Sequence, residues 1–254
     1  MIIGVDIGNT TVEIGFVKNL KNIISYRLKT DYQRTSDDWY LNINHLFSIE
    51  KLSNRDIDLI LISSVVPVVE KRIFDAFDKI HNKRPLIIGK DVNIPIVNKY
   101  HKPEEVGVDR LVNSLAVLKQ YGYPSIIVDL GTAITFDIIN RKGEYEGGAI
   151  FPGIDASISA LFSKTAKLPA VNLELIENPI GKNTADSIKS GIYFGYLSLI
   201  EGMIERINKY ENTTHKVIIT GGNGKLFADG IEMQSIFDDK LSMKGLYFLY
   251  QDLS

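Results

Sequence analysis

One short phrase occurs twice in this chain. Near the start it reads Asp6-Ile7-Gly8-Asn9-Thr10-Thr11, and half a chain later it reads Asp129-Leu130-Gly131-Thr132-Ala133-Ile134-Thr135. Each copy follows an apolar run and precedes a stretch of alternating apolar residues, a pattern that predicts a strand, a tight turn and a second strand. The copies begin at residues 6 and 129, a separation far beyond the ~20–50 residues of solenoid repeats. The sequence therefore predicts a duplicated domain, with two halves that face one ligand.

The boundary between the two halves is predicted near Gly122. A helix is expected over residues 109–121, and Gly122 followed by Tyr123-Pro124 cannot continue it. No flexible or low-complexity linker follows. We therefore expect two closely packed domains of alternating strands and helices, over residues 1–121 and 122–254.

Composition limits the classes of function. The 254 residues are 44% hydrophobic, so two modest domains can each bury a core. The net charge of -2 argues against a nucleic-acid platform, which normally carries a basic patch. The absence of cysteine excludes disulfides, thiolate catalysis and cysteine metal sites. With no apolar run near the ~20 residues that span a bilayer, and no signal peptide visible, we expect a cytoplasmic protein without membrane contact.

The first copy of the phrase has the chemistry of a phosphate site. Gly8 lets a ligand approach the backbone, and successive N–H groups in such a turn form a concave anion site. The Thr10 and Thr11 hydroxyls can donate to phosphate oxygens, while Asp6 suits the magnesium that accompanies ATP, through water. For one copy alone, an ordinary hairpin with an Asx-type turn is the better interpretation. The second copy, in the same strand context, favours nucleotide binding.

Other phosphate-binding motifs are absent from the sequence. There is no G-x-x-x-x-G-K-[ST], and no G-x-G-x-x-G follows the first strand. A glycine cluster, Thr220 to Gly224, does follow a predicted apolar strand. Ligands collect at the carboxyl ends of strands in open α/β sheets, so adenine or ribose could lie there, although a plain loop remains an alternative. The segment Gly147 to Gly153 is equally a turn near phosphate or a tight connection.

A third candidate lies between the two copies, at Gly107-Val108-Asp109-Arg110. A hydroxyl that accepts a phosphoryl group needs a carboxylate to take its proton, and Asp109 fits that role. The Arg110 guanidinium could clamp an acidic substrate. Alternatively, Asp109 is a helix N-cap.

The long helix predicted from Thr184 to about Tyr210 carries Gly191 and Gly195 four residues apart. Such spacing allows close packing against another helix, and a dimer interface is one hypothesis.

These motifs together resemble a known family. Paired D-x-G turns followed by strands are similar to the acetate kinase, hexokinase, Hsp70 and actin superfamily, and within it the chain closely resembles the type III pantothenate kinases. Any one of its motifs is weak, but five in this order are specific, and none departs from the family pattern. The matching segments are Asp6-x-Gly8-Asn9-Thr10; Tyr100-x-x-Pro103-x-x-x-Gly107-Val108-Asp109-Arg110; Asp129-x-Gly131-Thr132-Ala133 with Thr135; Gly147-Gly148-x-Ile150-x-Pro152-Gly153; and Thr220-Gly221-Gly222.

The resemblance implies an α/β fold of two similar actin-like (ribonuclease H-like) domains, each with a mixed five-stranded sheet flanked by helices. It also implies roles for individual residues. Asp109 would be the general base, and Asp129 would hold a monovalent cation, potassium or ammonium. ATP and its magnesium would be bound by Asp6, Gly8, Asn9, Thr10, Thr11, Gly131, Thr132, Thr135, Gly221 and Gly222. Pantothenate would be bound by Tyr100, Gly107, Val108, Asp109 and Arg110, with Thr184 supplied by the partner subunit of a homodimer.

The expected activity is ATP-dependent phosphorylation of pantothenate to 4'-phosphopantothenate, the first step of coenzyme A biosynthesis. Three alternatives stay open at the level of sequence. One is a different small-molecule kinase of the superfamily, the second is a nucleotide-binding regulatory protein without turnover, and the third is an actin-like filament former, for which the chain is short.

Overall fold

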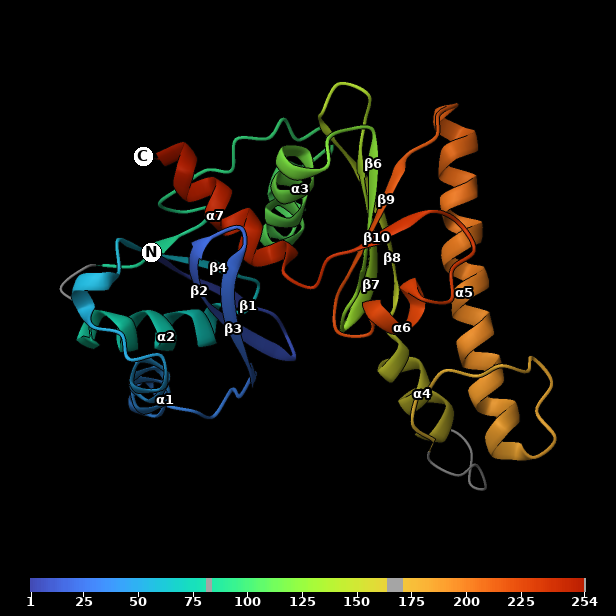
Figure 1. Cartoon of the computed structure of the whole chain (residues 1–254), viewed down its shortest axis with the longest axis horizontal. Helices are drawn as coiled ribbons and strands as arrows, with labels where there is room; N and C mark the ends of the chain where they lie inside the picture. The colour runs from blue at the N-terminus through green and yellow to red at the C-terminus, as the bar shows by residue number, and fades with distance from the viewer. Residues whose placement is uncertain (81–83, 164–170, 254) are drawn as a thin grey trace. The chain divides into compact units, whose positions relative to one another are not determined.

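The computed structural model describes residues 1–80, 84–163 and 171–253. The chain forms two compact units, Met1–Gln120 together with Lys240–Ser254, and Tyr121–Asp239. In Figure 1 the first unit holds the blue-to-green elements and the red C-terminal helix, and the second holds the elements that run from lime green through yellow and orange to orange-red. No helix in the described parts of the chain is long and apolar enough to cross a membrane.

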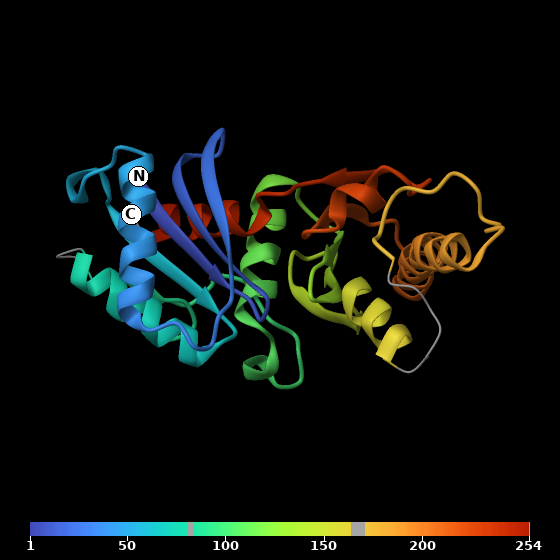
Figure 2. The same cartoon turned by 90° about the horizontal axis from the view of Figure 1, so that it is seen from below.

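The first unit is built on a mixed sheet of five strands. These are β1 (Ile2–Ile7), β2 (Thr11–Asn19), β3 (Asn22–Lys29), β4 (Leu59–Ser64) and β5 (Leu86–Ile87), in the order β3-β2-β1-β4-β5. β2 pairs antiparallel with β1 and β3, whereas β4 runs parallel to β1 and β5. Helices α1 (Ser36–Ile49) and α2 (Pro67–Ile80) lie on one face, and α3 (Val108–Gln120) and α7 (Leu241–Leu253) lie on the other (Figures 1 and 2). Two short 3-10 helices span Asn54–Asp56 and Pro103–Glu105.

The alternation of side chains along β1 separates two cores. Ile3, Val5 and Ile7 face α1 and α2, and they pack in one buried cluster with Trp39 and Phe77. The opposite face of the sheet is bare at Gly4 and Gly15, and α7 packs there. A Cβ on Gly15 would lie 2.3 Å from the Met243 sulfur, and one on Gly4 would lie 2.7 Å from Leu246 Cδ1. Glycine at these positions is therefore what lets α7 approach the sheet.

The second unit repeats the plan. Its strands are β6 (Ser125–Leu130), β7 (Ala133–Ile139), β8 (Tyr145–Pro152), β9 (Lys216–Thr220) and β10 (Ser235–Phe237), in the order β10-β9-β6-β7-β8. Its helices are α4 (Ile154–Ser163), α5 (Thr184–Glu211) and the short α6 (Gly224–Ala228). α5 buries Tyr193, Tyr196 and Ile200 in the core of this unit. Two similar mixed five-stranded sheets flanked by helices confirm the predicted fold class.

The division of the chain differs from the predicted one at its C-terminus. The break between Gln120 and Tyr121 lies one residue from the predicted boundary, but residues 240–254 belong to the first unit. α7 packs on α3, where a Cβ on Gly245 would lie 2.3 Å from the Val112 carbonyl oxygen. Lys119 and Asp252 form an ion pair at 2.9 Å between the same two helices. Because these partners are more than a hundred residues apart in the chain, local sequence patterns could not assign α7 to its unit.

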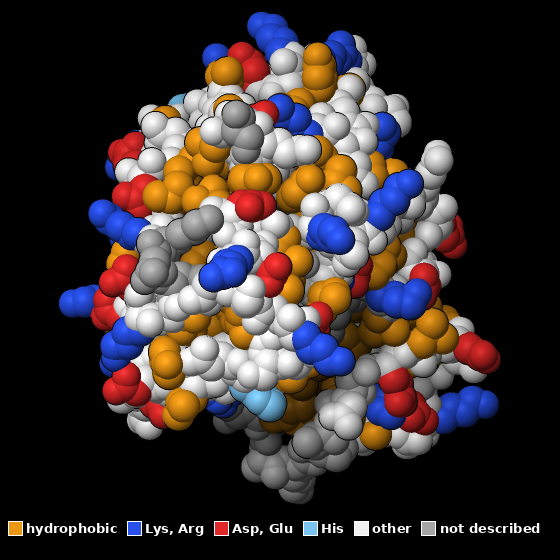
Figure 3. Space-filling view, turned by 60° about the vertical axis from the view of Figure 1, so that its left-hand side comes forward, with side chains coloured by type: hydrophobic (Ala, Val, Ile, Leu, Met, Phe, Trp, Pro, Cys, Tyr) orange, Lys and Arg blue, Asp and Glu red, His pale blue; other side chains and the backbone are white. Residues whose placement is uncertain are grey.

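Charged side chains are mixed over the face of the molecule shown in Figure 3. Lys and Arg alternate there with Asp and Glu, and hydrophobic side chains lie between them.

Candidate active site

The first D-x-G turn joins β1 to β2 at an open edge of the first sheet. The N–H of Gly8 donates to the Thr11 carbonyl oxygen at 2.9 Å and closes the turn. Asn9, Thr10 and Thr11 are exposed, as a binding turn requires. Asp6 lies next to Glu13 of β2 and Ser63 of β4 in the strand register. Its carboxylate therefore shares the sheet face that α3 and α7 cover.

Asp109 lies at the start of α3 in the same unit. The helix begins at Val108, and the N–H groups of Arg110 and Leu111 donate to the Gly107 carbonyl oxygen. Gly107 is therefore the N-cap, and the interpretation of Asp109 as a simple N-cap is wrong. The Asp109 carboxylate instead accepts the N–H of Arg110 at 2.9 Å. Burial raises the pKa of the Asp109 carboxyl, against the opposing effects of that hydrogen bond and of the Arg110 charge.

The surroundings of Asp109 are tight. A Cβ on Gly107 would lie 2.5 Å from Asp109 Oδ1 and 3.7 Å from Val65 Cγ1. Val65 directly follows β4, and its N–H donates to the Ile7 carbonyl oxygen. The ends of β1 and β4 and the start of α3 thus meet around Asp109. Sequence reasoning missed Val65, because nothing local marks it as a neighbour of Gly107.

Tyr100 lies in the irregular segment that leads to α3. Its N–H donates to Asn98 Oδ1 at 2.9 Å, and the Asn98 amide donates to the Pro103 carbonyl oxygen at 3.3 Å. One asparagine side chain thus bridges the turn before Gly107.

The second D-x-G turn joins β6 to β7, and the N–H of Gly131 donates to the Ala133 carbonyl oxygen at 3.1 Å. Asp129 lies next to Thr135 of β7 and Thr220 of β9 in the strand register. Gly221 follows with φ +92°, and a Cβ on it would lie 2.5 Å from Asp129 Oδ1. The second turn and the third glycine cluster therefore lie next to each other in the structure.

A buried polar chain lies behind Thr135, and sequence reasoning missed it. The Thr135 hydroxyl donates to Asp137 Oδ2 at 2.9 Å, and the Tyr145 hydroxyl donates to Asp137 Oδ1 at 2.8 Å. Asp137 is only 1% exposed and Tyr145 is fully buried. With its single proton committed to Asp137, the Thr135 oxygen presents lone pairs. Thr135 is thus better suited to coordinate a cation than to donate to phosphate. The sequence feature that could have revealed this buried chain is the Asp137 carboxylate in a mostly apolar strand.

The segment from Gly147 to Gly153 is neither the turn near phosphate nor the tight connection considered from the sequence. Most of it is the strand β8, and Gly147 and Gly148 line a hollow of about 290 Å3 beside Met203 and Tyr210 of α5. Gly153 lies behind the second turn, since a Cβ there would lie 2.1 Å from the Thr132 carbonyl oxygen.

Thr184 is exposed at the first position of α5. The preceding Asn183 caps the helix by accepting the N–H of Asp186 at 2.9 Å. The cap fixes the helix start and leaves the Thr184 side chain accessible.

No group of three or more His, Cys, Asp or Glu side chains converges as a metal site within the described ranges. The Asp6 carboxylate near the end of β1 is a single oxygen donor of the kind that Mg²⁺ uses when it keeps its waters and binds through one carboxylate and the phosphates of a nucleotide.

Comparison with known proteins identifies similar chains. The family model described as type III pantothenate kinase matches residues 2–206. A type III pantothenate kinase from Persephonella marina is 56% identical over 250 residues, which cover 98% of both chains.

Two solved structures have the same fold at low sequence identity. One is a putative Baf family transcriptional activator from Campylobacter jejuni, with a TM-score of 0.61 at 20% identity, covering 99% of this chain and 98% of that one. The other is a putative 2-dehydro-3-deoxygalactonokinase from Sinorhizobium meliloti, with a TM-score of 0.58 at 10% identity, covering 100% of this chain and 97% of that one.

The two adjacent glycines Gly221 and Gly222 should respond differently to substitution. Gly221→Ala places a Cβ 2.5 Å from Asp129 Oδ1 at a positive φ, which costs ~2 kcal/mol or more. We expect a melting temperature lower by roughly 4–8 °C in differential scanning calorimetry, and weaker nucleotide binding.

Gly222→Ala is the matched control, because a Cβ there meets nothing within 4 Å. Its melting temperature should equal that of the wild type. If a nucleotide lies against Gly222, only the nucleotide affinity of this variant falls. Equal melting temperatures for the two variants would contradict the assignment of Gly221 to the packed position.

Proposed function

Since the chain belongs to the type III pantothenate kinase family, and therefore phosphorylates pantothenate with ATP in coenzyme A biosynthesis, we propose that Asp109 is the general base of this reaction. The observation that carries this proposal is its half-buried carboxylate with a raised pKa, at the meeting point of β1, β4 and α3. A base works best when its pKa lies near the working pH. Burial raises the pKa of the Asp109 carboxyl toward the working pH.

The proposed step is a direct transfer. Asp109 takes the proton of the pantothenate primary hydroxyl while the hydroxyl oxygen forms a bond to the γ-phosphorus. The bond from that phosphorus to the β–γ bridging oxygen breaks, and ADP leaves with the electron pair. Such transfer depends on positioning and charge neutralisation more than on covalent help from the protein.

Pantothenate binding is proposed for the residues around this base. Tyr100, Gly107, Val108 and Arg110 would line its pocket, and Arg110 suits the pantothenate carboxylate because a guanidinium pairs with it in two hydrogen bonds. Gly107 leaves room beside Asp109, where a Cβ would lie 2.5 Å from Oδ1. Val65 completes an apolar side of the same pocket.

ATP binding is proposed for both D-x-G turns. In the first, Asp6 would hold magnesium through water and Gly8, Asn9, Thr10 and Thr11 would bind phosphate oxygens. In the second unit the binding residues would be Gly131, Thr132, Gly221 and Gly222, while Thr135, whose proton is donated to Asp137, would act as a ligand of the cation beside the phosphates. The exposure of Asn9, Thr10 and Thr11 supports this assignment, because N–H groups and hydroxyls of a turn can bind an anion.

A monovalent cation is proposed at Asp129. Potassium and ammonium take several oxygen ligands, and the register places the Asp129 carboxylate beside the Thr135 hydroxyl. Because the Thr135 hydroxyl donates its proton to Asp137, the lone pairs of the Thr135 oxygen remain available to bind a cation. When bound, the cation would supply positive charge near the phosphates.

A homodimer is proposed through the exposed face of α5. Gly191, Gly195 and Ser198 follow one another on that face and are exposed, and a Cβ on either glycine meets nothing within 4 Å. Small residues let two helix backbones approach closely. The exposed Thr184 at the start of α5 would then reach the pantothenate of the partner subunit.

We also propose that the enzyme is cytoplasmic and has no nucleic-acid or membrane partners. Its slightly acidic net charge argues against a nucleic-acid platform, which normally carries a basic patch.

The Asp109→Asn variant tests the base. We expect kcat to fall by ~100–10,000-fold, and the acid limb of the pH dependence of kcat/KM to disappear with it. Because the folded-state pKa of Asp109 is raised, ionisation costs stability, and that cost grows as pH rises from the unfolded pKa through the folded one. Asp109→Asn should therefore melt at the wild-type temperature or higher at pH 8.

Glu104→Gln is the control, since it removes an exposed carboxylate five positions away and should leave kcat unchanged. A fall in kcat of less than about tenfold in Asp109→Asn would show that Asp109 is not the base.

Replacing potassium by sodium tests the cation. We expect the rate to fall in sodium-only buffer, and Asp129→Asn to require a higher potassium concentration for half-maximal rate, because it removes one charged ligand. An undiminished rate in sodium alone would refute the cation proposal.

Substitution on the exposed face of α5 tests the dimer. Gly195→Leu has room in one subunit but would block a second helix, so light scattering should give a monomeric mass and kcat should fall while ATP still binds. Lys71→Leu adds the same side chain at an exposed position of α2 and should remain dimeric. A monomeric wild type at micromolar concentration, or a dimeric Gly195→Leu, would refute this interface.

A further inference from the structure

Thr30 lies just past the end of β3 and contacts the first D-x-G turn. Its hydroxyl donates to the Gly8 carbonyl oxygen at 2.7 Å, and its N–H donates to the Thr10 carbonyl oxygen at 2.9 Å. The residue is only 5% exposed. The β2–β3 ladder pairs Thr11 with Lys29, so Thr30 extends this ladder by one position onto the turn itself.

These two bonds fix the direction of the N–H groups in the turn. In a planar trans peptide the carbonyl and the N–H point in opposite directions. Because the Gly8 carbonyl points to Thr30, the N–H of Asn9 points away from it. The Thr10 carbonyl is held in the same way, so the N–H of Thr11 also points away from β3. Both residues are exposed, and parallel N–H groups of this kind form an anion site.

We propose that Thr30 is a positioning residue that aims the backbone N–H groups of the first turn at the phosphates of ATP. The proposal rests on the proposed role of this turn in ATP binding. Gly8 adopts many backbone conformations, so without the Thr30 hydroxyl the peptide between Gly8 and Asn9 is free to rotate. That rotation would leave the Gly8 carbonyl without its partner and would turn the Asn9 N–H out of the site.

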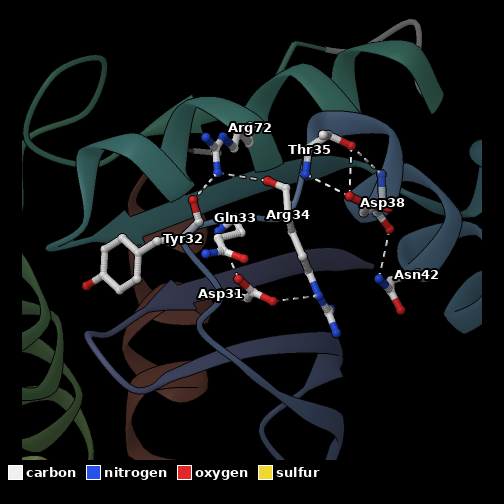
Figure 4. Close-up of polar contacts among 8 residues, drawn as sticks. All are labelled: Asp31, Tyr32, Gln33, Arg34, Thr35, Asp38, Asn42 and Arg72. Atoms are coloured by element: carbon white, nitrogen blue, oxygen red, sulfur yellow. Dashed lines mark hydrogen bonds and ion pairs between the residues drawn. The ribbon is translucent and has the colours of Figure 1, made fainter.

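The segment after Thr30 is itself held in place. Arg72 of α2 donates from Nη1 to the carbonyl oxygens of Tyr32 and Arg34 (Figure 4). The Arg34 guanidinium stacks over the Trp39 ring, 5.3 Å from its centroid. The β3 ladder on one side and these contacts on the other therefore leave Thr30 little freedom to move. A residue that positions other groups has to be held in place in this way.

A capping box completes the connection between β3 and α1. Thr35 and Asp38 exchange hydrogen bonds in both directions at the start of the helix, with Asp38 Oδ2 accepting the Thr35 N–H at 2.8 Å. Thr35 thus offers a matched control, because it is a nearby threonine whose hydroxyl is bonded to Asp38 within its own helix cap.

The test compares ATP with adenosine as ligands of the Thr30→Val variant. Valine keeps the approximate shape and the backbone N–H and replaces the hydroxyl by a methyl group, which cannot donate to the Gly8 carbonyl. Loss of one buried hydrogen bond of ~1–1.5 kcal/mol predicts that the Kd and KM for ATP rise by about five- to tenfold. The Kd for adenosine, which has no phosphates, and the KM for pantothenate should stay within about twofold of the wild type. Isothermal titration calorimetry and steady-state kinetics measure these constants.

Two further variants separate positioning from general stability. Thr30→Ser keeps the hydroxyl and should restore the ATP affinity. Thr35→Val should lower the melting temperature by removing the cap and leave both ligand affinities unchanged. If Thr30→Val does not fold, comparison of Thr30→Ala with Thr30→Ser repeats the test, since both lack the methyl group and only one lacks the hydroxyl.

The Asp6→Asn variant distinguishes the two possible failures. If Asp6→Asn weakens binding of magnesium ATP while Thr30→Val does not, the turn binds phosphate and Thr30 has no positioning role. If neither variant changes ATP affinity, the proposed phosphate role of the turn is itself wrong. Equal weakening of ATP and adenosine by Thr30→Val would overturn the inference, because that result indicates general loss of structure.

Discussion

The mixed pairing of one central strand in each sheet determines where the site residues can lie. β1 pairs antiparallel with β2 and parallel with β4, and β6 pairs in the same two ways with β7 and β9. The parallel partner ends at the same edge as the central strand, and the antiparallel partner begins there after a tight turn. One edge therefore collects a carboxylate, a flexible turn and a second strand end. Ligands of α/β sheets bind at such edges.

Local sequence was sufficient to predict what is local in this structure. The two turns, the strands around them, and the starts of α3 and α5 follow from apolar periodicity and glycine positions. The contacts that make these pieces into sites are long-range. Gly221 meets Asp129 only because β9 pairs with β6. Thr30 meets Gly8 only because the chain continues in the same direction past the last β2–β3 pair, Thr11 with Lys29, and no pattern in the sequence encodes that continuation.

Buried polar residues were the hardest to interpret from sequence, for a physical reason. A carboxylate such as Asp137, 1% exposed, is tolerated because two hydroxyl groups satisfy it, and the cost of leaving it unpaired would be several kcal/mol. Thr135 lies two residues before Asp137 on the same face of β7, whereas Tyr145 is brought to Asp137 by the pairing of β7 with β8. Asp109 differs from Asp137 in this respect. Its burial raises its pKa, which makes the carboxylate a stronger base and lowers the stability of the folded protein when it is ionised.

The two copies of the turn have diverged in the residue that faces their carboxylate. Asp6 lies next to Glu13 in the strand register. The Glu13 carboxylate accepts hydrogen bonds from the Ser25 hydroxyl at 2.6 Å and from Arg27 Nε at 3.0 Å. Asp129 lies beside the hydroxyl of Thr135. In the proposed assignment, an ion at Asp6 would meet one carboxylate, with the hydrogen-bonded Glu13 carboxylate next to it in the strand register, whereas an ion at Asp129 would meet a carboxylate and the Thr135 hydroxyl oxygen. A strongly hydrated divalent ion needs only one protein oxygen and keeps its waters, which suits Asp6. A weakly hydrated monovalent ion gains from neutral oxygens that replace its waters, which suits Asp129. Under this proposal, a duplicated strand, turn and strand would serve two different cations through a difference of one residue in the facing strand.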